Sequence, residues 1–143
     1  MKTHKFKQQG FTLIEIIVVV VIIGILATFV APKFLGKTDD ARIVKAKSDI
    51  QALESALDIY KLDNYAYPTT DQGLDALVTL PSGDPAPTNW QKGGYVKKLR
   101  KDPWQRDYLY LNPGERGEVD IYSLGADGVE GGEGANADIG NWE

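Results

Sequence analysis

The side chains of this sequence that could do chemistry are carboxylates, and several of them gather in a glycine-rich segment between residues 124 and 138. The acids of this segment are Asp127, Glu130, Glu133 and Asp138. Calcium binds about six to eight oxygen atoms, and glycines let backbone carbonyls turn toward an ion. The spacing is not that of an EF-hand, because positions three and five counted from Asp127 are Val129 and Gly131. The residues alone leave two alternatives open, a calcium-binding loop and a flexible linker.

Composition excludes several other kinds of chemistry. The sequence contains no cysteine, so a thiol nucleophile, a disulfide and a thiolate metal site are ruled out. Its one histidine is His4, so the commonest general base in proteins is missing from everything after that residue. A phosphate-binding loop does not fit the glycine-rich segment, because its acids repel phosphate and no Gly-Lys-Ser/Thr sequence ends it. We therefore predict that the chain is not an enzyme.

Charge is distributed unevenly along the chain. The net charge is −4, yet three lysines fall within the first ten residues without an acid. From Asp102 to the end, ten acids face two bases, Arg106 and Arg116. Such an acidic C-terminal third is a poor surface for nucleic acid and a suitable one for a hard cation. We expect no nucleic-acid partner.

A long apolar segment follows the basic N-terminal stub. Residues 11–30 contain one charge, Glu15, and as a helix would be ~30 Å long, enough to cross the hydrocarbon core of a bilayer. The lysines before this segment place the N-terminus in the cytoplasm. A cleaved signal peptide and a plain single-pass anchor are the alternatives, but neither explains a carboxylate inside the apolar segment. A functional role for Glu15 is the better interpretation.

Helical periodicity continues beyond the apolar segment. Pro32 bends or interrupts a helix in water, but apolar residues then recur every three or four positions. We predict one helix from about Phe11 to about Leu62, roughly 75–80 Å long if continuous. Its second half carries an apolar stripe for core packing, made of Ile43, Ala46, Ile50, Leu53, Leu57 and Tyr60.

The rest of the chain indicates a small sheet. Thr70 or Asp71 can cap a short helix that runs to about Val78, and residues 81–94 are rich in proline and glycine, as loops are. Alternating residues at 108–111 and 119–123 predict two strands, joined by a hairpin over 112–117. The predicted class is α+β: a long N-terminal helix with a membrane-spanning first half, packed on a small antiparallel β-sheet with an ordered C-terminal loop.

The junction at the start of the apolar segment is specific enough to suggest a family. The sequence from Gly10 to Glu15, Gly-Phe-Thr-Leu-Ile-Glu, resembles the processing site of the type IV pilin-like family. The resemblance implies that a prepilin peptidase cuts after Gly10 and that Phe11 becomes an N-methylated N-terminus. It also makes Glu15 the acid at the fifth position of the mature chain, with a role in filament assembly.

The second half of the chain narrows this resemblance to the major pseudopilins of type II secretion systems. The motifs are Tyr-Pro-Thr at 67–69, Asp-Pro-Trp at 102–104, Asp-Ile-Tyr-Ser-Leu-Gly-Ala-Asp-Gly at 120–128 and Ala-Asp-Ile-Gly-Asn-Trp at 137–142. Gln105 departs from the pattern, because we expect glycine after Asp-Pro-Trp. In that family a calcium ion is held in the C-terminal loop. The preferred ligands in this sequence are the side chains of Asp127 and Asp138 and the carbonyls of Leu124 and Val129, with Glu130 and Glu133 in reserve.

The resemblance implies a chain with three parts: a cleaved basic leader at 1–10, a transmembrane and filament-core helix at 11–31, and a periplasmic domain at 32–143. It implies a single-pass protein of the bacterial inner membrane, with its N-terminus in the cytoplasm. Its role would be the major structural subunit of a filament that assists export of folded proteins across the outer membrane.

The implied partners are copies of the chain itself, minor pseudopilins, an inner-membrane assembly platform and the prepilin peptidase. A surface-fibre type IV pilin and a membrane-tethered periplasmic enzyme are the rival hypotheses. The missing cysteine pair argues against the first, and the missing histidine and cysteine argue against the second.

Overall fold

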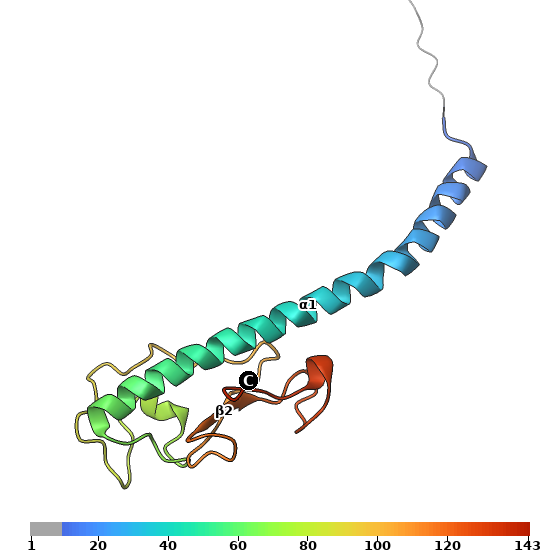
Figure 1. Cartoon of the computed structure of the whole chain (residues 1–143). Helices are drawn as coiled ribbons and strands as arrows, with labels where there is room; N and C mark the ends of the chain where they lie inside the picture. The colour runs from blue at the N-terminus through green and yellow to red at the C-terminus, as the bar shows by residue number, and fades with distance from the viewer. Residues whose placement is uncertain (1–9) are drawn as a thin grey trace, which may run out of the picture. The chain divides into compact units, whose positions relative to one another are not determined.

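The computed structural model describes residues 10–143, and for residues 29–37 the backbone alone. The predicted leader therefore lies outside the described residues, except for Gly10. The elements along the chain are α1 (Leu13–Asn64), η1 (Leu74–Leu77), β1 (Leu109–Leu111), β2 (Asp120–Ser123), η2 (Gly134–Asn136) and β3 (Ile139–Gly140) (Figure 1). The chain divides into two units, residues 1–38 and 39–143, and each is described by itself.

The long helix agrees with the prediction to within two residues at each end. Its backbone remains helical through Pro32 and Gly36. At the C-terminal end, the Asn64 side chain donates to the Tyr60 carbonyl (2.9 Å) and so satisfies a group that helix termination leaves free. Tyr65 follows with φ of 65°, in the left-handed conformation that commonly ends a helix.

The sheet is a three-stranded antiparallel meander in the order β1-β2-β3. The two predicted strands and their hairpin are confirmed, with Tyr110 opposite Ile121 at the centre of the pairing. The buried Asp120 carboxylate shapes the hairpin, because it accepts backbone N–H bonds from Glu115, Arg116 and Gly117. Alternation could not predict β3, because the strand has two residues.

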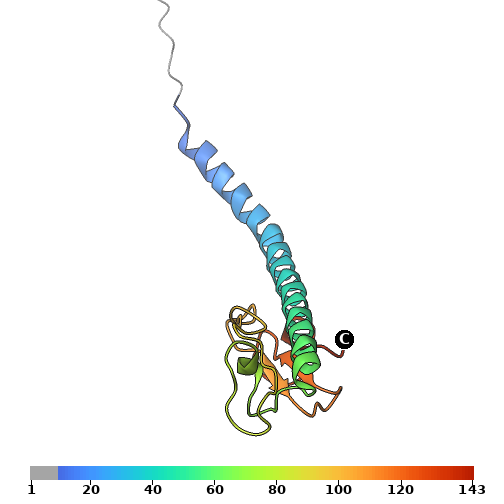
Figure 2. The ribbon, with the colours of Figure 1, turned by 90° about the vertical axis from the view of Figure 1, so that its left-hand side faces the viewer.

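The core of the second unit forms where α1 meets this sheet (Figures 1 and 2). Five residues of the predicted stripe are buried, and Ile43 packs against them half-buried. Their partners come from η1 and from the strand region: Leu74, Leu77, Tyr108, Tyr110, Val119, Ile121 and Ile139. The α+β class and the role of the stripe are confirmed.

The short helix predicted from Thr70 or Asp71 to about Val78 is wrong in extent. Only a single 3-10 turn, Leu74–Leu77, is present, and Gly73 before it has φ of 60°. The predicted cap Thr70 is engaged elsewhere, because its hydroxyl donates to the Asn112 carbonyl (3.0 Å) and accepts from the Asn112 N–H (2.9 Å). Thr69 provides the cap instead, because its hydroxyl accepts from the Gln72 N–H (3.2 Å), and the positive φ of Gly73 separates that turn from η1.

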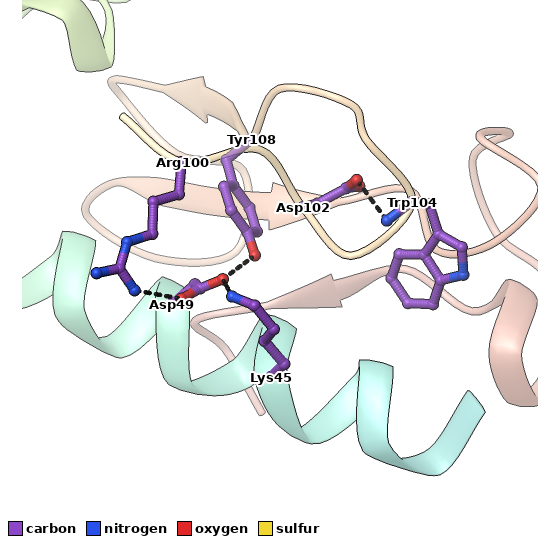
Figure 3. Close-up of polar contacts among 6 residues, drawn as sticks. All are labelled: Lys45, Asp49, Arg100, Asp102, Trp104 and Tyr108. Carbon is purple, nitrogen blue, oxygen red and sulfur yellow. Dashed lines mark hydrogen bonds and ion pairs between the residues drawn. The ribbon is translucent and has the colours of Figure 1, made fainter. Parts of the chain in front are cut away.

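Asp49 ties the segment before β1 to α1 (Figure 3). Its carboxylate accepts from Lys45 Nζ (2.5 Å) and from the Tyr108 hydroxyl (3.1 Å), and Arg100 lies 3.9 Å away. The Asp49 side chain is only 11% exposed, so these partners replace water. Burial, and next the charge of Asp49, raises the pKa of Tyr108; burial also raises the pKa of Tyr110.

These tyrosines predict a loss of stability in strong alkali. Unfolded tyrosine releases its proton near pH 10, whereas the folded protein keeps it. The unfolded state then binds fewer protons, so the free energy of unfolding falls as pH rises above 10, by up to ~1.4 kcal/mol per unit for each such tyrosine. Tyr108→Phe should make this slope shallower in denaturant titrations at pH 10–12. A slope in Tyr108→Phe equal to that of the parent chain would contradict this account.

Gln105 provides a second prediction, because its φ of 69° is left-handed. That conformation costs a residue with a Cβ roughly 1–2 kcal/mol, whereas glycine adopts it freely but loses more entropy on folding. Gln105→Gly should therefore raise the free energy of unfolding by about 0.5–1 kcal/mol. Denaturant midpoints of the full-length chain in detergent would measure it. Gln91→Gly, at an exposed residue without positive φ, should have the opposite sign.

Candidate functional site

The predicted processing junction is accessible in the first unit. Phe11 is 79% exposed, and a Cβ built on Gly10 meets no described atom within 4 Å. Packing within the described chain therefore does not require glycine at residue 10.

Glu15 has a local partner that the sequence analysis missed. The Glu15 carboxylate accepts from the Thr12 backbone N–H (3.4 Å), while the Thr12 hydroxyl accepts from the Glu15 backbone N–H (3.3 Å). This reciprocal pair is a capping box at the start of α1. Its signature, threonine followed three residues later by glutamate, is legible in the sequence. Glu15 thus stabilises the first helical turn within its own chain.

The apolar part of α1 that follows is exposed in the single chain. Each large apolar residue between Leu13 and Leu26 is 47–81% exposed. Burying one such side chain is worth ~1.5–3 kcal/mol, so this surface favours an apolar environment or partner. No helix within the described residues is both long and apolar enough to traverse a membrane.

The C-terminal loop contains all the predicted calcium ligands, and three of them accept hydrogen bonds within the loop. Asp127 Oδ1 accepts from the Val129 N–H (3.0 Å), and the Leu124 carbonyl accepts from the Gly128 N–H (3.2 Å). Asp138 Oδ2 accepts from the Gly131 N–H (2.9 Å). Glu130 and Glu133 are exposed, as expected for reserve ligands. Across the described residues, no three acidic or histidine side chains converge to hold a metal, so carbonyls would have to complete a site.

Asp138 provides the observation that fits a cation. Its second carboxylate oxygen, Oδ1, is buried without a hydrogen-bond partner. A buried acceptor left unpaired costs about 1–3 kcal/mol or more when it is charged, and a hard cation would remove that cost. The donor set of one orphaned carboxylate oxygen, a second acid and nearby carbonyls is therefore compatible with calcium.

Two further residues, Asp102 and Arg106, shape this loop and were not predicted. Asp102 is 1% exposed; its Oδ1 accepts from the Trp104 N–H (3.0 Å; Figure 3), and its Oδ2 accepts from the Ser123 hydroxyl (2.6 Å). Arg106 Nη2 donates to the Gly125 carbonyl (2.6 Å) and the Ala126 carbonyl (2.9 Å). The sequence held one indication of the role of Arg106, which is one of only two bases in the acidic C-terminal third of the chain.

Trp90 and Trp142 have structural roles. Trp90 donates from its indole nitrogen to the Ala76 carbonyl (2.8 Å) and packs on the core. The Trp142 ring lies 5.7 Å from that of Tyr122, with the Arg116 guanidinium 4.5 Å from its centre. Trp142 therefore fixes the end of the chain on the sheet.

Comparisons with known proteins cover both halves of the chain. Residues 5–31 match the family model for the prokaryotic N-terminal methylation motif, and residues 33–142 match the model for type II secretion system (T2SS), protein G. The type II secretion system core protein G of Vibrio cholerae is 63% identical over 136 residues, which are 95% of this chain and 92% of that protein. The same core protein of Pseudomonas aeruginosa is 60% identical over 137 residues, covering 96% of each.

A solved structure agrees with the sequence matches. The crystal structure of the major pseudopilin from the type 2 secretion system of enterohaemorrhagic Escherichia coli has a TM-score of 0.69 and 51% sequence identity. The match covers 76% of this chain and 88% of that one. The family consists of structural subunits and not of enzymes, which agrees with the residues available for chemistry. The shared fold, the N-terminal motif and these identities together show that the chain belongs to the type II secretion system protein G family.

Proposed function

We propose that this chain is the major subunit of a type II secretion pseudopilus, a filament that assists export of folded proteins across the outer membrane. The observation that carries the proposal is that both halves match in one chain, the methylation motif at 5–31 and the protein G domain at 33–142. The filament would contain copies of this chain with minor pseudopilins, built on an inner-membrane platform.

The N-terminal half supports processing and anchoring. A prepilin peptidase would cut between Gly10 and Phe11, and Phe11 would be methylated. Residues 11–31 would then anchor each subunit in the inner membrane, with residues 32–143 in the periplasm. The exposed apolar side chains between Leu13 and Leu26 support this, because burial in lipid or among neighbouring helices would stabilise them.

Glu15 would join subunits during assembly. Its carboxylate can accept from the free amine of Phe11 on a neighbouring copy, and in an apolar surrounding such a pair is stronger than in water, although desolvation offsets part of the gain. The capping box means that Glu15 has two separable properties. Its oxygen caps α1 within the subunit, and its negative charge is available to a second subunit.

We expect charge, and not helix capping, to control assembly. Glu15→Gln keeps a side-chain oxygen for the Thr12 N–H but removes the charge, whereas Thr12→Val removes the hydroxyl acceptor and keeps the charge. Filament yield on overproduction, scored by electron microscopy, should fall at least about tenfold for Glu15→Gln, as expected for loss of ~1.4 kcal/mol or more of pairing energy. Thr12→Val should assemble nearly normally.

Intact-mass measurement supplies the control for this experiment. Both variants should yield a mature chain that begins at methylated Phe11, so that any defect lies after processing. A parent chain that retains residues 1–10 would refute the proposed cut. Normal filament yield from Glu15→Gln would refute the pairing role of its charge.

The C-terminal loop supports calcium as a structural cofactor. When bound, the ion would cross-link the loop through oxygen atoms and offset the repulsion among its acids. Asp138 would contribute its unpaired Oδ1, and Asp127 its carboxylate. The carbonyls of Leu124 and Val129 would complete the set. These assignments rest on the orphaned oxygen and on the resemblance of the loop to its family.

Calcium should stabilise the parent chain but not a variant of Asp138. Because the metal would bind only the folded form, it adds RT ln(1 + [L]/Kd), roughly 2.7 kcal/mol at a hundredfold excess over Kd. Asp138→Asn should abolish the rise in melting temperature that calcium produces over chelator. Its melting temperature in chelator should not fall, because the unpaired charge is gone. Glu130→Gln, at an exposed acid of the same loop, should keep the response. A parent chain that melts identically with calcium and with chelator would refute the site.

A further inference from the structure

Arg106 is held in a tight turn whose other end is buried. The Asp102 N–H donates to the Arg106 carbonyl (2.7 Å), and the Arg106 N–H donates to Asp102 Oδ1 (2.8 Å). Asp102 is 1% exposed and also accepts from Trp104, so this turn is fixed on both sides. The backbone of Arg106 is therefore set independently of where its side chain goes.

The guanidinium of Arg106 reaches the start of the C-terminal loop. Its Nη2 donates to the carbonyls of Gly125 (2.6 Å) and Ala126 (2.9 Å). The approach is close, because a Cβ built on Gly128 would lie 2.8 Å from the Arg106 Cζ. Gly128 also has φ of 70°, so the loop wraps around the guanidinium with a residue that has no side chain.

Ser123 fastens the same part of the loop to the same turn. Its hydroxyl donates to Asp102 Oδ2 (2.6 Å) and accepts from the Gly125 N–H (3.3 Å). Gly125 is therefore held at its N–H through Ser123 and at its carbonyl by Arg106. Both links lead back to the turn between Asp102 and Arg106.

The residues that Arg106 holds are those that close the loop. The Ala126 N–H donates to the Ala135 carbonyl (2.8 Å), which joins the two arms of the loop. The Gly131 N–H donates to Asp138 Oδ2 (2.9 Å), closer to the tip. The Gly125 carbonyl and the Ala126 N–H belong to one planar peptide group, so fixing that carbonyl orients the donor of the first of these bonds.

We propose that Arg106 is the positioning residue of the C-terminal loop: through the Gly125 and Ala126 carbonyls, its guanidinium keeps the loop closed whether or not a metal ion is bound. Hydrogen bonds from a charged donor are about twice as strong as neutral ones. The positive charge also offsets the repulsion among acids such as Asp127, Glu130 and Glu133. The proposal concerns the loop of the proposed calcium site but does not require calcium.

Hydrogen exchange of the mature full-length chain in detergent, with a chelator present, tests this role. Exchange in peptides covering residues 124–138 should accelerate at least about tenfold in Arg106→Gln, as expected for two lost charge-assisted bonds. Peptides covering residues 46–60 of α1 should be unchanged, because the core does not depend on Arg106. Arg100→Gln, the same substitution at an arginine whose side chain is 71% exposed, should leave the loop as in the parent.

A second pair of variants approaches the same contact from the loop. Gly128→Ala and Gly134→Ala place a side chain at similar positive φ, 70° and 60°, but only the first directs its Cβ at the guanidinium; nothing described lies within 4 Å of the second. Gly128→Ala should therefore accelerate loop exchange at least about tenfold more than Gly134→Ala. If Arg106→Gln also accelerates exchange in α1, the variant has loosened the core as well, and the comparison of Gly128→Ala with Gly134→Ala then tests the positioning role of Arg106.

Loop exchange within twofold of the parent in Arg106→Gln, with Gly128→Ala equal to Gly134→Ala, would overturn the positioning role. Failure of the calcium proposal has a different signature. It would appear as identical exchange of the parent loop in calcium and in chelator, and would leave the effect of Arg106→Gln in place. Slower exchange in calcium for the parent and the variant alike would support both proposals together.

Discussion

Burial of one stripe of α1 against the sheet is the constraint on which the rest of the second unit depends. Ala46, Ile50 and Leu57 are 0–2% exposed and share one core cluster with Ile121, which is fully buried. Burying apolar area is worth ~25 cal/mol per Å², and no other element here offers a comparable apolar face. The loops are long in relation to the strands, so they can be ordered only by attachment to this central layer.

Buried carboxylates provide much of that attachment. Asp102 and Asp120 are 1% and 2% exposed, and each accepts bonds from backbone N–H groups of its own turn. Asp49, on α1, accepts instead from two side chains, the Tyr108 hydroxyl and the Lys45 ammonium group. In a chain without cysteine, these acids link segments of the fold as disulfides do in many small secreted domains. Each is stable when buried because its oxygens are paired.

The parts of this fold that the sequence predicted are those set by periodicity. The stripe from Ala46 to Tyr60 repeats over about four turns, and this pattern indicates a helix with one buried face. The hairpin was predictable for the same reason, since alternation on both sides of a Pro-Gly turn restricts the register. At Gln105 even a departure from the expected pattern was informative, because the residue has the positive φ that glycine would favour.

Contacts between distant residues were not predictable in this way. Charged residues are exposed by default, so no local signal distinguishes the buried Asp102 from the exposed Asp107. The predicted cap Thr70 instead bonds the backbone of Asn112, far along the chain, and the neighbouring Thr69 caps the turn. Arg106 and the orphaned oxygen of Asp138 likewise depend on which segments meet in space. The contacts that hold the C-terminal loop therefore could not be predicted from the sequence, and its role as a calcium site stays a prediction.

The capping box at the start of α1 changes how subunit addition should be understood. A glutamate without a hydrogen-bond partner would carry an unpaired charge, and placing it in an apolar environment would be costly. Here the Glu15 carboxylate already accepts a hydrogen bond from Thr12 in the isolated chain. In the proposed contact, the amine of another subunit would be a second donor to a carboxylate that the Thr12 N–H already engages through one oxygen. The first turn of the helix would then keep its cap as the contact between chains forms, so that subunit joining would not require the helix end to unwind.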